Sequence, residues 1–296
     1  MPTEINNARH GVWTDMIEVN NRVFYDIMNY EVPQPKELFF LSLDIKDKAF
    51  YVFPKKESEF PRQNKSEIFE EFINRINKWW FLYKSIPFVK SIYLCNSITF
   101  NKIDENSDID IFIVCKEKRL WIARFFSNLF FFLFRLKRHW KKVAKRFCLS
   151  FYITDTDLNL YNFTLKPYDL YFIYWIVHLV PLYAEDIDSK DEIYKSNKWI
   201  SESLININLT QNIFLGNKLF TGRSFIKNIL EKLYNWKFGN LTEKLIKFFR
   251  LPIMLFKNQR LWAKASGVSI WEDHLKFYWW DIRKKVNLKF KLIRGY

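Results

Sequence analysis

Glycine, cysteine and histidine are scarce in this sequence. None of its 6 glycines lies between Gly11 and Gly216, so the central part of the chain lacks the residue that tolerates left-handed backbone conformations best. The 3 cysteines, Cys95, Cys115 and Cys148, form no CxxC pair, which argues against a disulfide framework and predicts buried, reduced thiols. The 4 histidines are scattered along the chain and give no zinc-binding signature.

Clear patterns of a secretory signal or a membrane span are also scarce in this sequence. The first residues show no basic stretch followed by an apolar one, so we expect no secretory signal and a cytoplasmic protein. The apolar run at residues 120–136 has 17 residues and contains Arg124, whereas a membrane span needs about 20 apolar residues. We expect a buried or half-buried helix in this run, with a membrane-associated helix as the alternative.

The composition otherwise indicates a folded and strongly basic protein. Of the 296 residues, 49% are hydrophobic and 20% aromatic, which argues against general disorder. The net charge of +15 points to a polyanionic partner, namely nucleic acid, nucleotide phosphates or an anionic membrane surface. AT-rich coding also enriches a chain in Lys, Asn, Ile and Phe, so the charge alone does not establish a binding face.

The pattern along the chain predicts three parts. Residues 1–64 read as a helix, a short helix and a strand with basic flanks, the order of a small winged-helix-like segment. Residues 65–187 alternate between helices and strands, which predicts an α/β domain with a mixed sheet and flanking helices. Residues 188–296 read as a helical, basic C-terminal region. The elements expected in the middle part are strands at 89–95, 108–115 and 147–153 and helices at 65–86, 119–136 and 165–183.

Two aspartates open the second of these strands. Side chains at i and i+2 of a strand point to the same side, so Asp108 and Asp110 are expected to project together. Two carboxylates so close repel each other unless a cation lies between them. Oxygen ligands of this kind favour Mg²⁺, which can also hold the phosphates of a nucleotide. An exposed Asp-x-Asp turn without a metal is the alternative interpretation.

The stretch CNSITFNKIDENSDIDIFIV (residues 95–114) resembles the nucleotidyltransferase superfamily, which has a DNA polymerase beta-like fold. That family carries Gly-Ser at the end of one strand and Asp-x-Asp at the start of the next. The resemblance implies that Asn96 and Ser97 bind the nucleotide and that Asp108 and Asp110 are catalytic and bind Mg²⁺. Further stretches, among them KRFCLSFYIT and GVSIWEDHLKF, look like a bacterial subgroup of uncharacterised nucleotidyltransferase-domain proteins.

The sequence departs from the family pattern at two positions. Asn96 stands where the family has glycine, and asparagine is the residue that best replaces glycine in a left-handed conformation. Active members carry a third carboxylate on a later strand, and the matching position here is expected to be Ser150. A hydroxyl group cannot replace a carboxylate as a general base. Asp155 and Asp157, just past that strand, are the nearest acids and are expected to be loop or helix-capping residues.

Two functions follow from these observations. The first is an Mg²⁺-dependent nucleotidyltransferase that moves a nucleoside monophosphate from an NTP to a hydroxyl group of RNA or protein. The alternative is a catalytically degenerate module of the same fold that binds nucleic acid or an anionic membrane surface. The basic run at residues 116–146, with 11 Lys or Arg against 1 acid, would attract a triphosphate or an RNA backbone, and His139 and Trp140 could stack on a base. A solvated, basic helix end is the alternative for this run.

Overall fold

The computed structural model describes residues 67–99, 103–139, 141–165, 169–200, 218–262, 268–277 and 283–284. The winged-helix-like segment expected at residues 1–64 lies outside these ranges, and so does Trp140.

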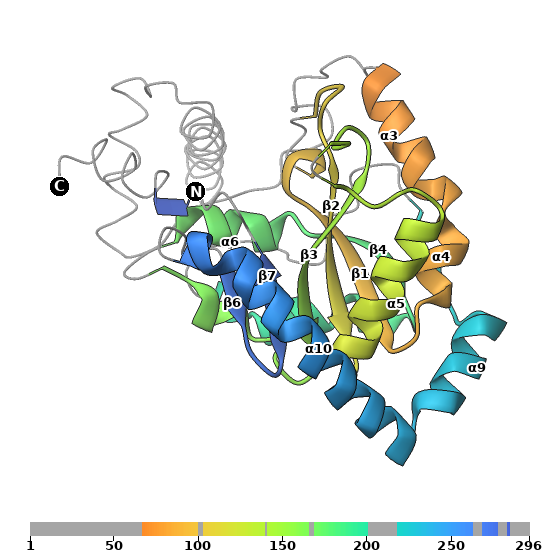
Figure 1. Ribbon diagram of the computed structural model, residues 1–296. Helices are drawn as coiled ribbons and strands as arrows, with labels where there is room; N and C mark the ends of the chain where they lie inside the picture. The colour runs from red at the N-terminus through yellow and green to blue at the C-terminus, as the bar shows by residue number, and fades with distance from the viewer. Residues whose placement is uncertain are drawn as a thin grey trace, which may run out of the picture.

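A seven-stranded mixed sheet forms the centre of the molecule (Figure 1), which confirms the expected α/β class. The strand order is β5-β4-β1-β2-β3-β7-β6. The pairs β2–β3 and β4–β5 are parallel and the other neighbours are antiparallel. The strands are β1 (Val89–Cys95), β2 (Ile109–Cys115), β3 (Phe147–Thr154), β4 (Val180–Ala184), β5 (Phe220–Thr221), β6 (Val268–Ile270) and β7 (His274–Phe277).

Both faces of the sheet are buried, which explains why the central strands read as nearly continuous apolar runs. On β2, Ile109, Ile111 and Ile113 point into one hydrophobic core, while Phe112 and Val114 point into the other. This alternation is the period of two that a strand imposes on its side chains. Because Asp110 has the parity of Phe112, it lies on the face of the second core.

Helices cover the two faces. The first core is covered by α3 (Glu67–Lys78), α4 (Trp80–Ser85) and α5 (Leu120–Leu133), and the second by α6 (Leu170–Val177) and α7 (Glu192–Ser196). Figure 1 shows α10 (Lys237–Trp262) in front of the sheet and α9 (Phe225–Tyr234) at the outer edge of the molecule. Short 3₁₀ helices lie at Asn96–Ile98 (η1), Leu160–Phe163 (η2) and Asp188–Lys190 (η3).

The prediction of one helix at residues 165–183 is wrong for the second half of this range. The helix α6 ends at Val177, and the chain then enters β4, which pairs antiparallel with β1. Pro181 lies inside β4, where the register of the β1–β4 pair shifts. A proline is tolerated in a sheet at such an irregularity because its missing N–H breaks no regular hydrogen bond there.

The sequence predicts a helical C-terminal region, but the structure shows strands there as well as helices. This region supplies the long helices α9 and α10, but also β5, β6 and β7, which join the same sheet as the middle part of the chain. The strands β6 and β7 extend the sheet beyond β3, and β5 extends it beyond β4. The short lengths of these strands, 2 to 4 residues, explain why they leave no clear alternation in the sequence.

The Phe-rich run at residues 120–136 forms α5, which packs on β3 and α10. Arg124 lies inside this apolar helix with its guanidinium group 5.2 Å from the ring centre of Tyr152 and 4.5 Å from that of Phe277. The helix ends at Leu133, and the chain turns at Arg135, which has a positive φ of 55°. Among the helices in the described ranges, none is both long enough and apolar enough to cross a bilayer.

Candidate functional site

The structure brings Asp108 and Asp110 together at the start of β2, as the sequence predicts. Their carboxylate oxygens and the Cys148 sulfur all lie within 4.8 Å of one another. Cys148 comes from the start of β3, where it pairs in register with Asp110. All three side chains are half-buried, so they form a small cluster at the ends of two inner strands, β2 and β3, that remains accessible from solvent.

Asn96 and Ser97 lie next to this cluster. Cys95, the last residue of β1, pairs with Asp110, so Asn96 follows directly at the neighbouring strand end. Asn96 has a φ of 60°, the left-handed conformation that the family's glycine would adopt. Its side-chain oxygen accepts a hydrogen bond from the Tyr171 hydroxyl at 3.3 Å, and its side chain also hydrogen-bonds to Asp110. Ser97 is half-buried in the 3₁₀ helix η1 that follows.

Cys148, and not Ser150, occupies the position beside the aspartate pair. We expected Ser150 there because the family's third carboxylate lies on this strand. The β2–β3 register pairs Asp110 with Cys148, two residues before Ser150 on the same strand. Ser150 is buried and hydrogen-bonds to the Cys148 side chain. Nothing in the sequence marks Cys148 as part of a site, since the pairing of β2 with β3 is a tertiary contact.

Arg138 is a second residue that the sequence analysis did not single out. Its Nη1 atom lies 2.5 Å from the Asp108 carboxylate and 3.7 Å from the Cys148 sulfur. It belongs to the basic run, which does not form the solvated helix end considered above. After α5 the chain makes a short loop closed by the bridge between His139 and Lys142, and then returns into β3. This return places Arg138 over the aspartate pair.

Two further residues of the basic run make contacts within the fold. Lys145 forms an ion pair with Glu71 of α3 at 2.6 Å, and Arg146 donates a hydrogen bond to the Arg135 carbonyl oxygen. The charge of Lys145 is therefore paired with Glu71 and is not free to act on the aspartate pair.

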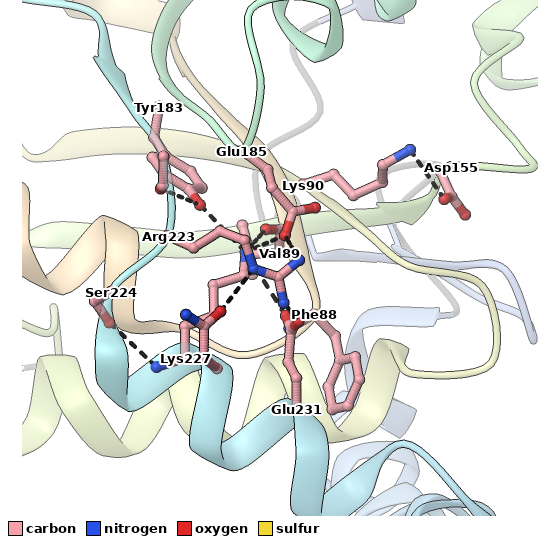
Figure 2. A network of polar contacts seen from close by, with 12 residues as sticks. Phe88, Val89, Lys90, Asp155, Tyr183, Glu185, Arg223, Ser224, Lys227 and Glu231 are labelled. Carbon is pink, nitrogen blue, oxygen red and sulfur yellow. Dashed lines mark hydrogen bonds and ion pairs between the residues drawn. The ribbon is translucent and has the colours of Figure 1, made fainter.

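Asp155 and Asp157 take no part in the cluster. They follow the last residue of β3, whereas the cluster lies at its first residues. Asp155 accepts a hydrogen bond from the Glu117 backbone N–H and lies 3.4 Å from the Lys90 ammonium group (Figure 2). Asp157 lies 3.2 Å from His274. Both are loop residues, as expected.

The electrostatics of the cluster favour a proton or a cation. Burial, followed by the charge of Asp108, raises the pKa of Asp110 to about 6, against hydrogen bonds from Asn96 and Cys148 and the charge of Arg138. Burial and the two carboxylates raise the pKa of the Cys148 thiol well above its ordinary value. The thiol is therefore protonated at neutral pH and cannot serve as a general base. Burial alone would lower the pKa of Arg138, but Asp108 and Cys148 raise it overall.

The cluster fits Mg²⁺ through its two carboxylates. Mg²⁺ binds one or two carboxylates and fills its remaining positions with water and phosphate oxygens. The protonated Cys148 sulfur is too soft to be a third ligand for this ion. The Arg138 guanidinium group forms an ion pair with Asp108 in the described structure. A metal ion bound by both carboxylates would therefore compete with this guanidinium group.

No protein-family model, curated protein or solved structure matches this chain, so the nucleotidyltransferase assignment is a hypothesis that stands on the residues described above.

Proposed function

We propose that this chain binds a nucleoside triphosphate with Mg²⁺ at the start of β2 and transfers the nucleoside monophosphate to an acceptor hydroxyl group, with release of pyrophosphate. The observation that carries the proposal is the convergence of Asp108 and Asp110 beside Asn96, whose φ is positive. Two acids on one strand and a left-handed residue at the end of the neighbouring strand are the arrangement that the family resemblance implies.

Each residue has a role that its position supports. Asp108 and Asp110 would hold the metal ion, which supplies charge stabilisation for a phosphoryl group when bound. The left-handed turn at Asn96 leads the chain into η1, and Ser97 would contact the phosphates. Arg138 neutralises the pair before a metal binds and, once displaced from Asp108, is a second cation for the triphosphate.

A specific observation favours a second candidate, a module of the same fold that binds nucleotide or nucleic acid without turnover. The cluster contains a protonated thiol at Cys148, where an active member of the family would have a carboxylate. The acceptor hydroxyl would then have no protein group to take its proton, and transfer would depend on the phosphates of the substrate or on water.

Labelled nucleotide transfer separates the two candidates. The full-length protein is incubated with labelled NTPs, Mg²⁺ and either RNA or protein acceptors, beside Asp108→Asn/Asp110→Asn. Glu105→Gln removes an exposed carboxylate from the same loop and serves as the matched control. Transfer that the double variant loses and the control keeps supports the enzyme. Transfer that persists in the double variant refutes the assigned site, and NTP binding without transfer supports the second candidate.

Substitution of Cys148 tests whether the lack of a third carboxylate limits the transfer reaction. Cys148→Asp restores a third carboxylate, whereas Cys148→Ser changes the side chain without adding one. A transferase limited by its general base gains activity in Cys148→Asp only. Equal activities in the two variants would show that the group at this position does not limit the reaction.

A further inference from the structure

The helices α9 and α10 present large apolar side chains to solvent. On α9, Phe225, Ile226, Ile229 and Leu233 are each about half exposed or more, and Phe225 reaches 78%. On α10 the exposed apolar residues are Phe238, Leu241, Leu245, Phe248, Phe249, Ile253 and Phe256. Together these residues are called the apolar face below. So many exposed large apolar side chains on two neighbouring helices of a folded protein mark an interaction site.

The helix α9 has an unusual pattern, because two of its three charged residues, Lys227 and Glu231, face the protein while four of its apolar residues face outward. Its other apolar residues, Leu230 and Tyr234, pack against the first core. Lys227 is fully buried and donates hydrogen bonds to the Val89 carbonyl oxygen and the Tyr183 hydroxyl. Figure 2 shows Lys227 and Glu231 of α9 converging with Arg223 and Glu185 at the start of β1. A helix that needs only water on its outer side would carry the opposite pattern.

This orientation of α9 is fixed by contacts at its start. The Ser224 side chain accepts a hydrogen bond from the Lys227 backbone N–H and so caps the first turn. Turning the apolar side inward would take Lys227 and Glu231 away from their buried partners.

Polar contacts also hold α10 and the turn before it. Glu243 accepts hydrogen bonds from the Trp121 and Ile122 backbone N–H groups at 2.7 and 2.9 Å, so α10 caps the start of α5. Arg119 donates to the Tyr234 and Asn235 carbonyl oxygens at the end of α9. These contacts orient the helix pair with its apolar face outward.

The apolar residues of α10 form one stripe. At 3.6 residues per turn, they cover an arc of about 140° on the outer side of the helix. The opposite side carries Glu243 and packs Leu251 and Met254 against the first core. The stripe is therefore a separate surface and not an exposed margin of the hydrophobic core.

The charges around the apolar face are cationic. Residues 225–256 contain 6 Lys or Arg and 2 Glu, and both glutamates, Glu231 and Glu243, make the inward contacts described above. Of the 6 cations, Lys227 is buried and Lys247 pairs with Glu272. Lys232, Lys237 and Lys244 are exposed beside the apolar residues. Trp236, 83% exposed, lies between the two helices. Apolar and aromatic side chains flanked by lysines are the composition of helices that lie in the interface of an anionic bilayer.

We infer that the apolar face of α9 and α10 binds the surface of an anionic lipid bilayer, with both helices lying in the plane of the headgroups. The lysines complement the lipid charge, and the phenylalanine side chains enter the acyl boundary. A second copy of this chain fits less well, because a symmetric contact would bring the lysines of the two copies together.

This surface is independent of the candidate nucleotide site. The helices contact the start of α5, just beyond the last residue of β2, whereas the aspartate pair lies at its first residues. The seven residues of β2 span about 20 Å, at 3.3 Å per residue, between the aspartate pair and the start of α5 where Glu243 binds. Loss of one activity therefore need not affect the other.

Flotation of the full-length protein with vesicles tests the inference. Phosphatidylcholine vesicles are compared with vesicles that also contain phosphatidylserine, at low and high salt. We expect the protein to float with the anionic vesicles only, and less at high salt. Phe248→Ser/Phe249→Ser should lower the partition coefficient at least about tenfold, because two apolar side chains no longer enter the bilayer. Lys232→Gln/Lys244→Gln should lower it by about tenfold or more.

Phe132→Ser is the matched control. Phe132 is as exposed as Phe248, at 70%, but lies near the far end of α5, where its neighbour Phe134 contacts Trp79. This variant should bind vesicles as the wild type does, and the melting temperatures of all variants should match within a few degrees.

The inference is overturned if the wild type stays with the soluble fraction, or if the Phe248 and Phe249 variant floats as well as the control. A dimer in sedimentation equilibrium that this variant dissociates, without vesicle binding by the wild type, would instead make the face a contact between copies. Either result leaves the nucleotide-transfer assay unaffected, so the two proposals fail separately.

Discussion

Asp110→Asn should stabilise the fold at neutral and higher pH in the absence of metal. The side chain lies beside Asp108 in a half-buried site, and its pKa is raised from 3.8 to about 6, first by burial and then by the neighbouring charge. An asparagine has nearly the same shape and can accept the hydrogen bond from Asn96, but it brings no charge into the site. Residues selected for function are often destabilising in this way.

The size of the effect follows from the two pKa values. Between pH 3.8 and about 6 the folded protein binds the Asp110 proton more tightly than the unfolded chain does. The stabilisation from this proton is therefore complete below pH 3.8 and lost as the pH rises through 6. A difference of about two pH units corresponds to at most about 3 kcal/mol. We expect about 1–2 kcal/mol, because the carboxyl group remains partly exposed to solvent.

Urea unfolding with a chelator present measures this difference. At pH 8 the free energy of unfolding of Asp110→Asn should exceed that of the wild type by this amount, and the gap should shrink as the pH falls to 4.5. Glu105→Gln should show no such pH-dependent gap. Added Mg²⁺ should stabilise the wild type and not Asp110→Asn. A variant that is less stable than the wild type at pH 8, or a gap that does not depend on pH, would refute the electrostatic reasoning.

Three further predictions concern other contacts. Arg138→Gln should bind Mg²⁺ about tenfold more tightly in calorimetry, because no guanidinium group competes for the aspartate pair; weaker binding would contradict this competition. Gly239→Ala should lower the melting temperature by several degrees, since its Cβ would lie 1.7 Å from the Tyr234 carbonyl oxygen; an unchanged melting curve would count against the tight α9–α10 turn. Lys227→Met should reduce the free energy of unfolding by about 3 kcal/mol, because Glu185 then loses a buried partner; a neutral result in urea unfolding would mean that Arg223 alone satisfies the carboxylates.

The central strands could be predicted because each one carries its own signal. β1 starts and ends where the sequence predicts, and β2 and β3 do so within one residue. Their apolar runs are long, and a proline or a polar loop bounds them. The strand β4 was missed, because its five residues continue the apolar pattern of the preceding helix and contain a proline. Local periodicity cannot separate a short buried strand from the end of a buried helix.

The candidate site was predictable only as far as neighbours along the chain define it. Asp108 and Asp110 share a face because of the strand period, and Asn96 was identified by its place before Ser97 and by its tolerance of a positive φ. Cys148 and Arg138 reach the pair through the β2–β3 register and through the return of the loop after α5. The register that pairs Cys148, and not Ser150, with Asp110 has no counterpart in the spacing of the sequence.

The sequence by itself determined the α/β class, the main central strands and the pairing of two carboxylates, because these follow from interactions between residues close along the chain. The tertiary structure alone decided what lies beside that pair, namely a protonated thiol and a guanidinium group, and which side of α9 faces outward. Both depend on contacts between segments far apart in the sequence. In α9 the burial of Lys227 and Glu231 with partners from other elements turned the apolar residues to the surface, although the pattern of the helix alone would have placed them inside.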